Sequence, residues 1–536
     1  MNVAVSPAIA GQDLSLRNER RGHLPLLIAI ATYTATTAAI LFASYRMASG
    51  HFIYTLDDPY INMAMAKNLA LHGVWGVSPY EFSSSTSTPF FMLLLSLIYR
   101  LTGPDQFVPF ALSWVFGLCS IYVAWQIVTE SLTILWQTVA LVAVVLFAPL
   151  FVVGTLGMEH SLHLFLTLLF LKHFDADDNS TLPLAMVTFA MTATRYEGLF
   201  VAAVGFLLLA VQRKWGRAAT VAVFAWLPVL VFAVFSIHHH GYWLPNSVAL
   251  KGAQVHGAIT TTVESALVNS IKNLVLAPHL PCLAAASVVI ALSIRKFHPK
   301  LANRVGLVGG AACLHLVFAD VGWVFRYEDY LVAGGVLVIA CALPEVRRAC
   351  DQRFVREVSY ILILAGVLLT GRSMVAGWSL PKYSRAIYLQ QWQTANFLSA
   401  YYRDAAVAAN DIGAIDYRTD LHLLDLEGLA NADIFAAKRA GIYSTQFIDE
   451  EAKKRGVEIA AIYDSWFSLH PRSPYGGPPI PSSWIRVRRW QVPHREQLGD
   501  ATVSFYGLTP EEAKRLDARL RTFEAALPKE IKVMDH

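Results

Sequence analysis

The sequence predicts a polytopic α-helical membrane protein with about eleven transmembrane helices, interfacial helices in its first outer loop and a C-terminal soluble α/β domain. Of the 536 residues, 55% are hydrophobic and only 15% are charged, whereas soluble chains carry about 25% charged residues. The apolar residues gather in runs between Leu24 and Trp378, and about 20 apolar residues in a helix cross the hydrocarbon core of a bilayer. After Leu380, charged residues become frequent and no such run occurs.

The expected spans follow the apolar runs of residues 24–379, the predicted transmembrane domain. Several runs have only about 14–15 residues, so they would need polar flanks or local thinning of the bilayer to cross it. The run from Pro89 to Leu101 is shorter still, and a helix there is expected to lie in the outer interface. The expected spans are residues 24–47, 107–128, 132–154, 159–173, 181–194, 198–212, 218–237, 274–294, 303–323, 328–344 and 357–377.

Basic residues predict the orientation of this domain. Arg17, Arg20 and Arg21 precede the first span, and cytoplasmic loops carry an excess of Lys and Arg. Residues 1–23 therefore form a predicted cytoplasmic tail, and an odd number of spans leaves residues 380–536 outside the cytoplasm. The predicted location is a bacterial inner or plasma membrane, in contact with membrane lipids.

Composition and motifs exclude several classes of function. The net charge is only +4, which suggests no nucleic-acid partner. The five cysteines form no Cys-x-x-Cys pair, so neither a disulfide framework nor a metal site is expected from them. The sequence also has no Gly-x-x-x-x-Gly-Lys loop, so a nucleotide-driven pump lacks support.

The first outer loop, residues 48–106, contains the most informative motif. Asp58 followed by Pro59 is a typical helix start, and Gly73 is a typical stop. This helix is expected to be amphipathic and to lie on the membrane. Asp57 is left unexplained by capping, and a carboxylate beside the hydrocarbon is costly unless it is hydrated, paired or used. Asp57, Asp58 and Glu81 are therefore the candidate catalytic carboxylates, although helix capping by Asp58 and a linker role for Glu81 remain alternatives.

Further polar residues occur at the predicted outer ends of the spans, where each alone would be an interfacial anchor or a local ion pair. Together they bring both signs of charge to one membrane face, which suggests a cavity for a phosphate and a polar acceptor, with Arg or Lys on the phosphate. These candidate substrate-binding residues are Glu159, His160, Arg195, Glu197, Asn246, Lys251, Arg326 and Tyr327.

The tail, residues 380–536, alternates strand-like and helical stretches, which predicts a small α/β domain. The Pro- and Gly-rich segment 471–481 is expected to be a loop. Strands are expected at Ala405–Ile415, with breaks at Asn410-Asp411 and Gly413, and at Leu421–Leu426 and Val457–Tyr463. Helices are expected at Asp433–Ala440, Thr445–Arg455 and Pro510–Ala526.

The order of these motifs resembles the GT-C superfamily of membrane glycosyltransferases, which includes protein mannosyltransferases, aminoarabinose transferases and arabinofuranosyltransferases. The resemblance rests on Asp57-Asp58-Pro59-Tyr60-Ile61 after one span, followed by Glu81 before a Ser/Thr-rich segment. It extends to Gly157-Met158-Glu159, Arg195-Tyr196-Glu197-Gly198, Leu244-Pro245-Asn246 with Lys251, Arg326-Tyr327, and to residues 410–415 and 424–429 in the tail.

This resemblance implies transfer of a hexosyl or pentosyl group from a polyprenyl-phosphate sugar to a cell-envelope glycan, lipid or protein on the outer face. It implies that Asp57 acts as the base or positions the acceptor, and that Glu81 is the second acidic residue. The motif reads Asp58-Pro59 where those families usually have Asp-Ala or Asp-Glu, which leaves open which aspartate acts. Some members use a divalent cation and others none, and no metal-ligand set is evident here. Two other classes of function remain open: a secondary transporter, and an envelope sensor or assembly protein whose outer domain binds a ligand.

Overall fold

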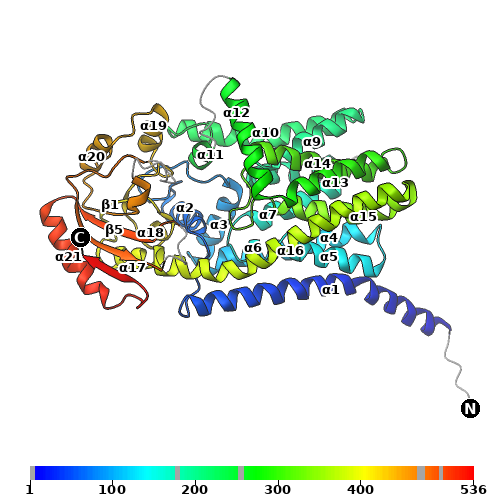
Figure 1. Ribbon diagram of the computed structural model, residues 1–536, viewed down its shortest axis with the longest axis horizontal. Helices are drawn as coiled ribbons and strands as arrows, with labels where there is room; N and C mark the ends of the chain where they lie inside the picture. The colour runs from blue at the N-terminus through cyan, green and yellow to red at the C-terminus, as the bar shows by residue number, and fades with distance from the viewer. Residues whose placement is uncertain (1–6, 175–180, 252–258, 468–476, 494–498, 536) are drawn as a thin grey trace, which may run out of the picture.

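The computed structural model describes residues 7–174, 181–251, 259–467, 477–493 and 499–535, without the side chains of residues 7–21, 249–251, 259–263 and 265. A helical bundle and a mixed α/β domain lie at opposite ends of an elongated molecule, and α1 starts at the end farthest from the α/β domain (Figure 1). The bundle contains α1 (Pro7–Met47), α4 (Phe107–Thr129), α5 (Ile134–Phe147), α6 (Leu150–Val153), α7 (His160–Phe174), α8 (Leu182–Thr194), α9 (Gly198–Val211), α10 (Trp215–His238), α11 (Asn246–Lys251), α12 (Ile259–Leu276), α13 (His279–Ile294), α14 (Pro299–Phe318), α15 (Asp329–Ala349) and α16 (Gln352–Leu389).

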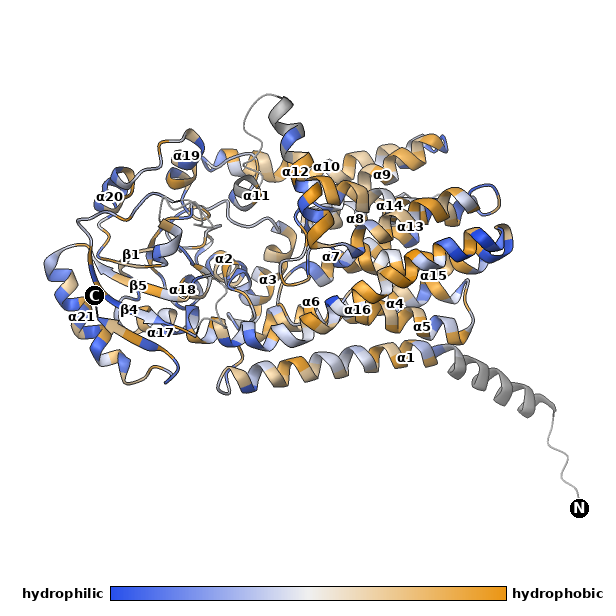
Figure 2. Cartoon of the chain, viewed as in Figure 1, coloured by the Kyte–Doolittle hydropathy of each residue, from blue (hydrophilic) through white to orange (hydrophobic). Residues whose placement is uncertain are grey.

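The bundle has the length and composition of a membrane domain. Over the described ranges, six helices are long and apolar enough to cross a bilayer, or seven if the pair α12 and α13, bent by 101°, forms one span. Figure 2 shows that hydrophobic residues dominate the bundle, whereas the α/β domain and the far ends of several helices are more hydrophilic. The chain is therefore an integral membrane protein. The predicted count of eleven spans is not confirmed, because helices such as α5 and α8, with 14 and 13 residues, are short for a crossing.

Two helices of the segment 48–106 lie between the bundle and the α/β domain (Figure 1). These are α2 (Asp58–His72), which ends at Gly73 in a left-handed conformation as expected, and α3 (Pro89–Thr102). The prediction of an amphipathic α2 on the membrane surface is wrong. Its polar residues Asn62, Lys67 and Asn68 are buried together with its apolar ones, because the α/β domain covers the helix and shares one hydrophobic core with it.

The α/β domain contains one six-stranded sheet with the strand order β2-β1-β3-β5-β4-β6. The strands β1, β2 and β3 pair in parallel, and the other pairs are antiparallel. The elements of this domain are α17 (Gln391–Tyr401), β1 (Ala406–Ala409), α18 (Gly413–Arg418), β2 (His422–Asp425), α19 (Ala432–Ala440), α20 (Thr445–Lys454), β3 (Ile459–Ile462), a short 3₁₀ helix (Asp464–Phe467), β4 (Ile485–Gln491), β5 (Thr502–Gly507), α21 (Pro510–Glu524) and β6 (Lys532–Asp535).

The sequence prediction for this domain is right in part. The expected helices and the expected strands at β2 and β3 are confirmed to within a few residues. The expected strand over residues 405–415 ends at Ala409, directly before the expected break at Asn410-Asp411, but the stretch after the break is wrong, because it forms α18 instead of a strand. The expected loop at residues 471–481 lies mostly outside the described residues. No strand was predicted from the sequence at the positions of β4, β5 and β6.

Candidate active site

A cavity of about 130 Å³ lies where α2, the start of α7 and the α/β domain meet. Its charged walls are formed by Asp58, Glu159, Arg195 and Arg326. Tyr327, four consecutive hydroxyl-bearing residues at positions 85–88 and Leu429 of the α/β domain also line it. These residues are far apart in the sequence, so the cavity forms only in the complete fold.

Asp58 and Arg326 form the first ion pair of the cavity. Nη2 of Arg326 donates to Oδ2 of Asp58 at 2.5 Å, and the guanidinium also lies over the ring of Tyr327. The side chain of Arg326 is 2% exposed, whereas that of Asp58 is 42% exposed. The arginine thus fixes the carboxylate, which is partly exposed where it lines the cavity.

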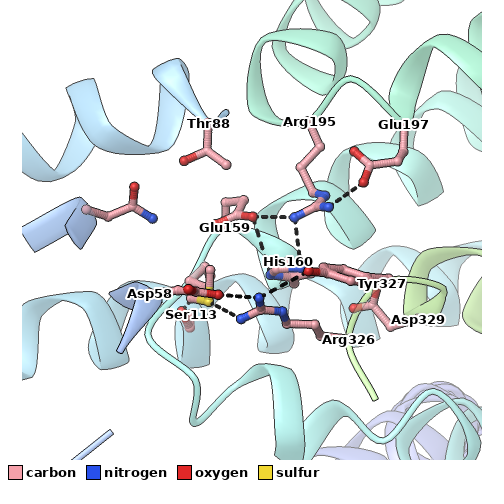
Figure 3. A network of polar contacts seen from close by, with 12 residues as sticks. Asp58, Thr88, Ser113, Glu159, His160, Arg195, Glu197, Arg326, Tyr327 and Asp329 are labelled. Atoms are coloured by element: carbon pink, nitrogen blue, oxygen red, sulfur yellow. Dashed lines mark hydrogen bonds and ion pairs between the residues drawn. The ribbon is translucent and has the colours of Figure 1, made fainter. Parts of the chain in front are cut away.

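Glu159 and Arg195 form the second ion pair, on the opposite side of Tyr327 (Figure 3). Nη1 of Arg195 lies 2.5 Å from Oε1 of Glu159 and 2.8 Å from Nε2 of His160. Nη2 of Arg195 donates to Glu197. Burial alone would raise the pKa of Glu197, but the Arg195 guanidinium lowers it to about 2. The site therefore holds two guanidinium groups in fixed positions, each neutralised by carboxylates.

Asp57, the neighbour of Asp58, is buried away from this cavity. Its Oδ2 and Oδ1 accept hydrogen bonds from the backbone N–H groups of Gly413 and Ala414, at 2.5 and 2.8 Å. Burial and the nearby Asp411 carboxylate raise its pKa well above the ordinary value. Asp57 also occupies the N-cap position of α2 without capping it, so the expected capping by Asp58 is wrong. The Asp57 carboxylate instead caps the first turn of α18.

Lys67, which lies within α2, holds the other end of α18. Its Nζ donates to the backbone carbonyls of Asp416, Tyr417 and Thr419 at 3.0, 3.2 and 2.8 Å. Oxygen acceptors at the first turn of a helix satisfy its free N–H groups, and a cation at the last turn satisfies its free carbonyls and complements the helix dipole. We call Asp57 and Lys67 the α18 clamp, because one side chain at the N-cap position of α2 and one within α2 hold the two ends of one helix of the α/β domain.

The other predicted residues lie around the edge of the cavity or away from it. Glu81 accepts hydrogen bonds from Asn431 at 2.5 Å and Arg455 at 3.2 Å, so it contacts the α/β domain rather than the cavity. Asn246 donates to the carbonyl of Leu429 at 3.1 Å and thereby supports one cavity wall. The side chain of Lys251 lies outside the described part of the chain.

Sequence reasoning missed several residues that shape the cavity. Leu429 reaches it because Asp425 accepts hydrogen bonds from the N–H groups of Glu427 and Ala430 and so folds the loop after β2. The Ser/Thr-rich segment after Glu81, which supplies positions 85–88, was not predicted to line a site. Met158, whose sulfur accepts from Arg326, was noted only as part of a motif. The run of six Ser and Thr residues from Ser83 to Thr88, which follows Glu81, was the available signal.

The donor set of the cavity does not fit a metal ion. Asp58 and Glu159 are each held by an arginine, and a guanidinium beside a carboxylate competes with a cation for the same oxygens. Across the residues that the structure describes, no three His, Cys, Asp or Glu side chains are grouped to hold a metal. We therefore derive no step that involves a metal.

Comparison of the sequence with known families gives one match. Residues 384–506, in the α/β domain, match a family described as "Domain of unknown function (DUF8728)". No curated protein matches the chain.

Comparison with solved structures gives matches over most of the chain. The oligosaccharyltransferase of Archaeoglobus fulgidus in its apo form matches with a TM-score of 0.53 and 12% identity, over 91% of this chain and 75% of that one. The ArnT protein of Cupriavidus metallidurans bound to undecaprenyl phosphate matches with a TM-score of 0.50 and 12% identity, over 90% of this chain and 98% of that one. Its apo state gives a TM-score of 0.50 and 13% identity over the same shares. At this identity the likeness concerns the fold, and this chain has the fold of the GT-C glycosyltransferases, as the sequence resemblance implied.

Proposed function

We propose that this protein is a membrane glycosyltransferase that moves a sugar from a polyprenyl-phosphate donor to a hydroxyl group of an envelope glycan, lipid or protein. One observation carries the proposal: two guanidinium groups and two carboxylates, Arg326 with Asp58 and Arg195 with Glu159, line one cavity at the end of a membrane bundle. The GT-C fold supports the same class of reaction.

Asp58 is the proposed base of the reaction. The acceptor hydroxyl donates a hydrogen bond to the exposed face of this carboxylate, and its oxygen attacks the anomeric carbon of the sugar. The bond between that carbon and the phosphate oxygen breaks, the lipid phosphate leaves with the bonding electrons, and the proton passes to Asp58. Asp57 was the first candidate for this role, but its engagement with α18 favours Asp58.

The two arginines are proposed to stabilise the leaving phosphate. Charge grows on the phosphate oxygens as the bond breaks, and donors fixed in advance stabilise that charge without reorganisation. Arg195 and Arg326 are 8% and 2% exposed, and each is fixed by a carboxylate. Arginine suits this role because its planar fork binds phosphate in a bidentate manner and remains protonated.

The hydroxyl-bearing wall at positions 85–88 is proposed to face the sugar. Thr86 donates to Asn62 at 3.1 Å, and each Ser or Thr hydroxyl of this wall can both donate and accept a hydrogen bond. Such groups match the hydroxyls of a sugar ring.

The test begins with cells that lack the protein. A comparison of their envelope glycans, glycolipids and glycoproteins with those of the parent strain identifies the product. Transfer is then measured in vesicles that contain the purified full-length chain and the lipid-linked donor of that sugar. Asp58→Asn is expected to lower turnover by about 10²–10⁴-fold, the usual contribution of a base.

The matched control is Asp320→Asn. Asp320 is a partly exposed carboxylate paired with Lys272 at 2.7 Å and lies outside the cavity lining. It is expected to leave turnover within about twofold, since exposed pairs contribute little. Full turnover in Asp58→Asn, or an envelope unchanged by loss of the protein, would overturn the proposal.

A further inference from the structure

The turn that carries Arg326 and Tyr327 has an unusual backbone. Gly322, Trp323, Val324 and Phe325 all have positive φ angles, of 79°, 33°, 58° and 62°. The N–H of Arg326 donates to the carbonyl of Gly322 at 3.1 Å and closes this left-handed turn. Only the first of the four residues is a glycine.

A left-handed turn of this composition is strained. For L-residues the left-handed conformation brings Cβ too close to the following carbonyl oxygen, and a β-branched residue such as Val324 is a clear outlier there. Such strain persists only where the surroundings fix the backbone, and it is concentrated at functional sites. The contacts that fix this turn are therefore informative.

A buried ion pair holds the turn at both ends. Oε2 of Glu328 accepts from the N–H of Gly322 at 2.9 Å, at the start of the turn. Nη2 of Arg372, from α16, donates to the carbonyl of Phe325 at 2.6 Å, at its end. The same nitrogen donates to Oε1 of Glu328 at 2.9 Å, so the two holding groups are bonded to each other. His279 of α13 also approaches Glu328, at 3.4 Å.

Neither member of this pair lines the cavity. Glu328 is 0% exposed and Arg372 is 8% exposed. A carboxylate and a guanidinium that only filled space would be costly to bury, since burial removes both from water. Their bonds to the turn give them a specific use, because Arg326 follows the last left-handed residue directly.

We propose that Glu328 and Arg372 are positioning residues: they hold residues 322–325 in the left-handed turn that sets Arg326 against Asp58. This inference rests on the proposed function and deepens it, because the proposed function assigns Arg326 to the phosphate of the donor. A purely structural role for the ion pair is the competing interpretation. The two differ at Val324, because only the positioning role makes the strain of the turn matter.

The substitution Val324→Gly separates the two interpretations. Glycine adopts positive φ as readily as negative φ, so Val324→Gly lowers the strain that the ion pair must hold. Arg372→Lys keeps the buried positive charge beside Glu328, which avoids an unpaired carboxylate, but an ammonium lacks the planar fork of a guanidinium. The matched control is Arg353→Lys on the same helix, where the arginine is 82% exposed.

The experiment uses the full-length chain in lipid nanodiscs, with two measurements. Hydrogen exchange of peptides that cover residues 320–330 reports on the turn without any substrate. Binding of undecaprenyl phosphate, as the probe, reports on Arg326. In Arg372→Lys we expect exchange in the turn to rise and the affinity for the probe to fall, each by about tenfold, which corresponds to roughly 1.4 kcal/mol. Adding Val324→Gly should reverse at least half of the rise in exchange and of the fall in affinity, each on a logarithmic scale. Arg353→Lys should change neither exchange nor affinity.

Three other outcomes have fixed meanings. Unchanged exchange in Arg372→Lys would overturn the positioning role. If Arg372→Lys raises exchange and lowers affinity but Val324→Gly reverses neither effect, the positioning role is overturned as well, and Arg372 is a structural residue. If exchange rises and recovers as expected while the wild type binds no undecaprenyl phosphate, the turn is held as inferred and the proposed function loses its phosphate site instead.

Discussion

The α18 clamp predicts that Lys67→Met detaches the α/β domain from α2. Lys67 is 8% exposed, and its Nζ donates to the carbonyls of Asp416, Tyr417 and Thr419 and pairs with Asp420 at 3.2 Å. Hydrogen bonds to a charged group contribute about 1.5–3 kcal/mol each. Bonds to one ammonium group are not additive, and methionine retains most of the apolar stem. We therefore expect the docked state to lose about 2–4 kcal/mol, which raises the undocked population by about 30- to 800-fold.

Limited proteolysis of the full-length chain in nanodiscs measures this population, provided that opening and closing are fast relative to cleavage. Lys272→Met is the matched control, because Lys272 pairs with Asp320 at 2.7 Å but is 51% exposed. An exposed pair of this kind contributes about 0–1 kcal/mol, and cleavage should change little. If Lys67→Met and Lys272→Met are cleaved at the same rate, the α18 clamp does not hold the domain and the reasoning is refuted.

Two further predictions concern the other end of the clamp. Because the pKa of Asp57 is raised in the folded protein, the docked state binds a proton that the unfolded chain has lost above about pH 4, so docking should weaken as the pH rises toward the raised pKa. Asp411→Asn removes the neighbouring charge, and the proteolysis rate of this variant should depend less on pH; an unchanged pH profile would contradict the prediction. Gly413→Ala would bring Cβ to 2.3 Å from the backbone oxygen of Asp57 and should raise cleavage at least as much as Lys67→Met does. Gly371→Ala, where a Cβ meets no atom within 4 Å, is the control that should leave cleavage unchanged.

The sequence could predict the helical part of this fold because the signal is local. Apolar runs and helix stops such as Gly73 depend only on neighbouring residues, and the expected ends of α2, α4 and α9 lie close to those observed. The strands β4 and β6 were not expected. Their segments contain charged residues, and Arg488 of β4 is buried only because Asp517, Glu524 and Asp535 surround it. Such pairing across the fold has no local signature.

The candidate site could be located from the sequence, but the roles of its residues could not. Residues at the predicted outer ends of the spans, such as Glu159, Arg195 and Arg326, do come together in one cavity. Asp57 and Asp58 were indistinguishable as neighbours in one motif. The start of a helix turns consecutive side chains in different directions, so one carboxylate meets α18 and the other meets Arg326. Glu81 also faces the α/β domain, a contact between residues far apart in the chain that no local pattern predicts.

The motif Asp57-Asp58 thus links two parts of the molecule through one helix. Asp57 is bonded to the α/β domain, and Asp58, one residue later, is bonded to the turn that Glu328 and Arg372 hold. Leu429 of the α/β domain lines the same cavity. Since α2 is buried and shares a hydrophobic core with the α/β domain, a shift of that domain would move the cavity wall and the proposed base together. The α/β domain is therefore part of the catalytic unit in this proposal, and variants of the α18 clamp should lower transfer even though neither Asp57 nor Lys67 lines the cavity.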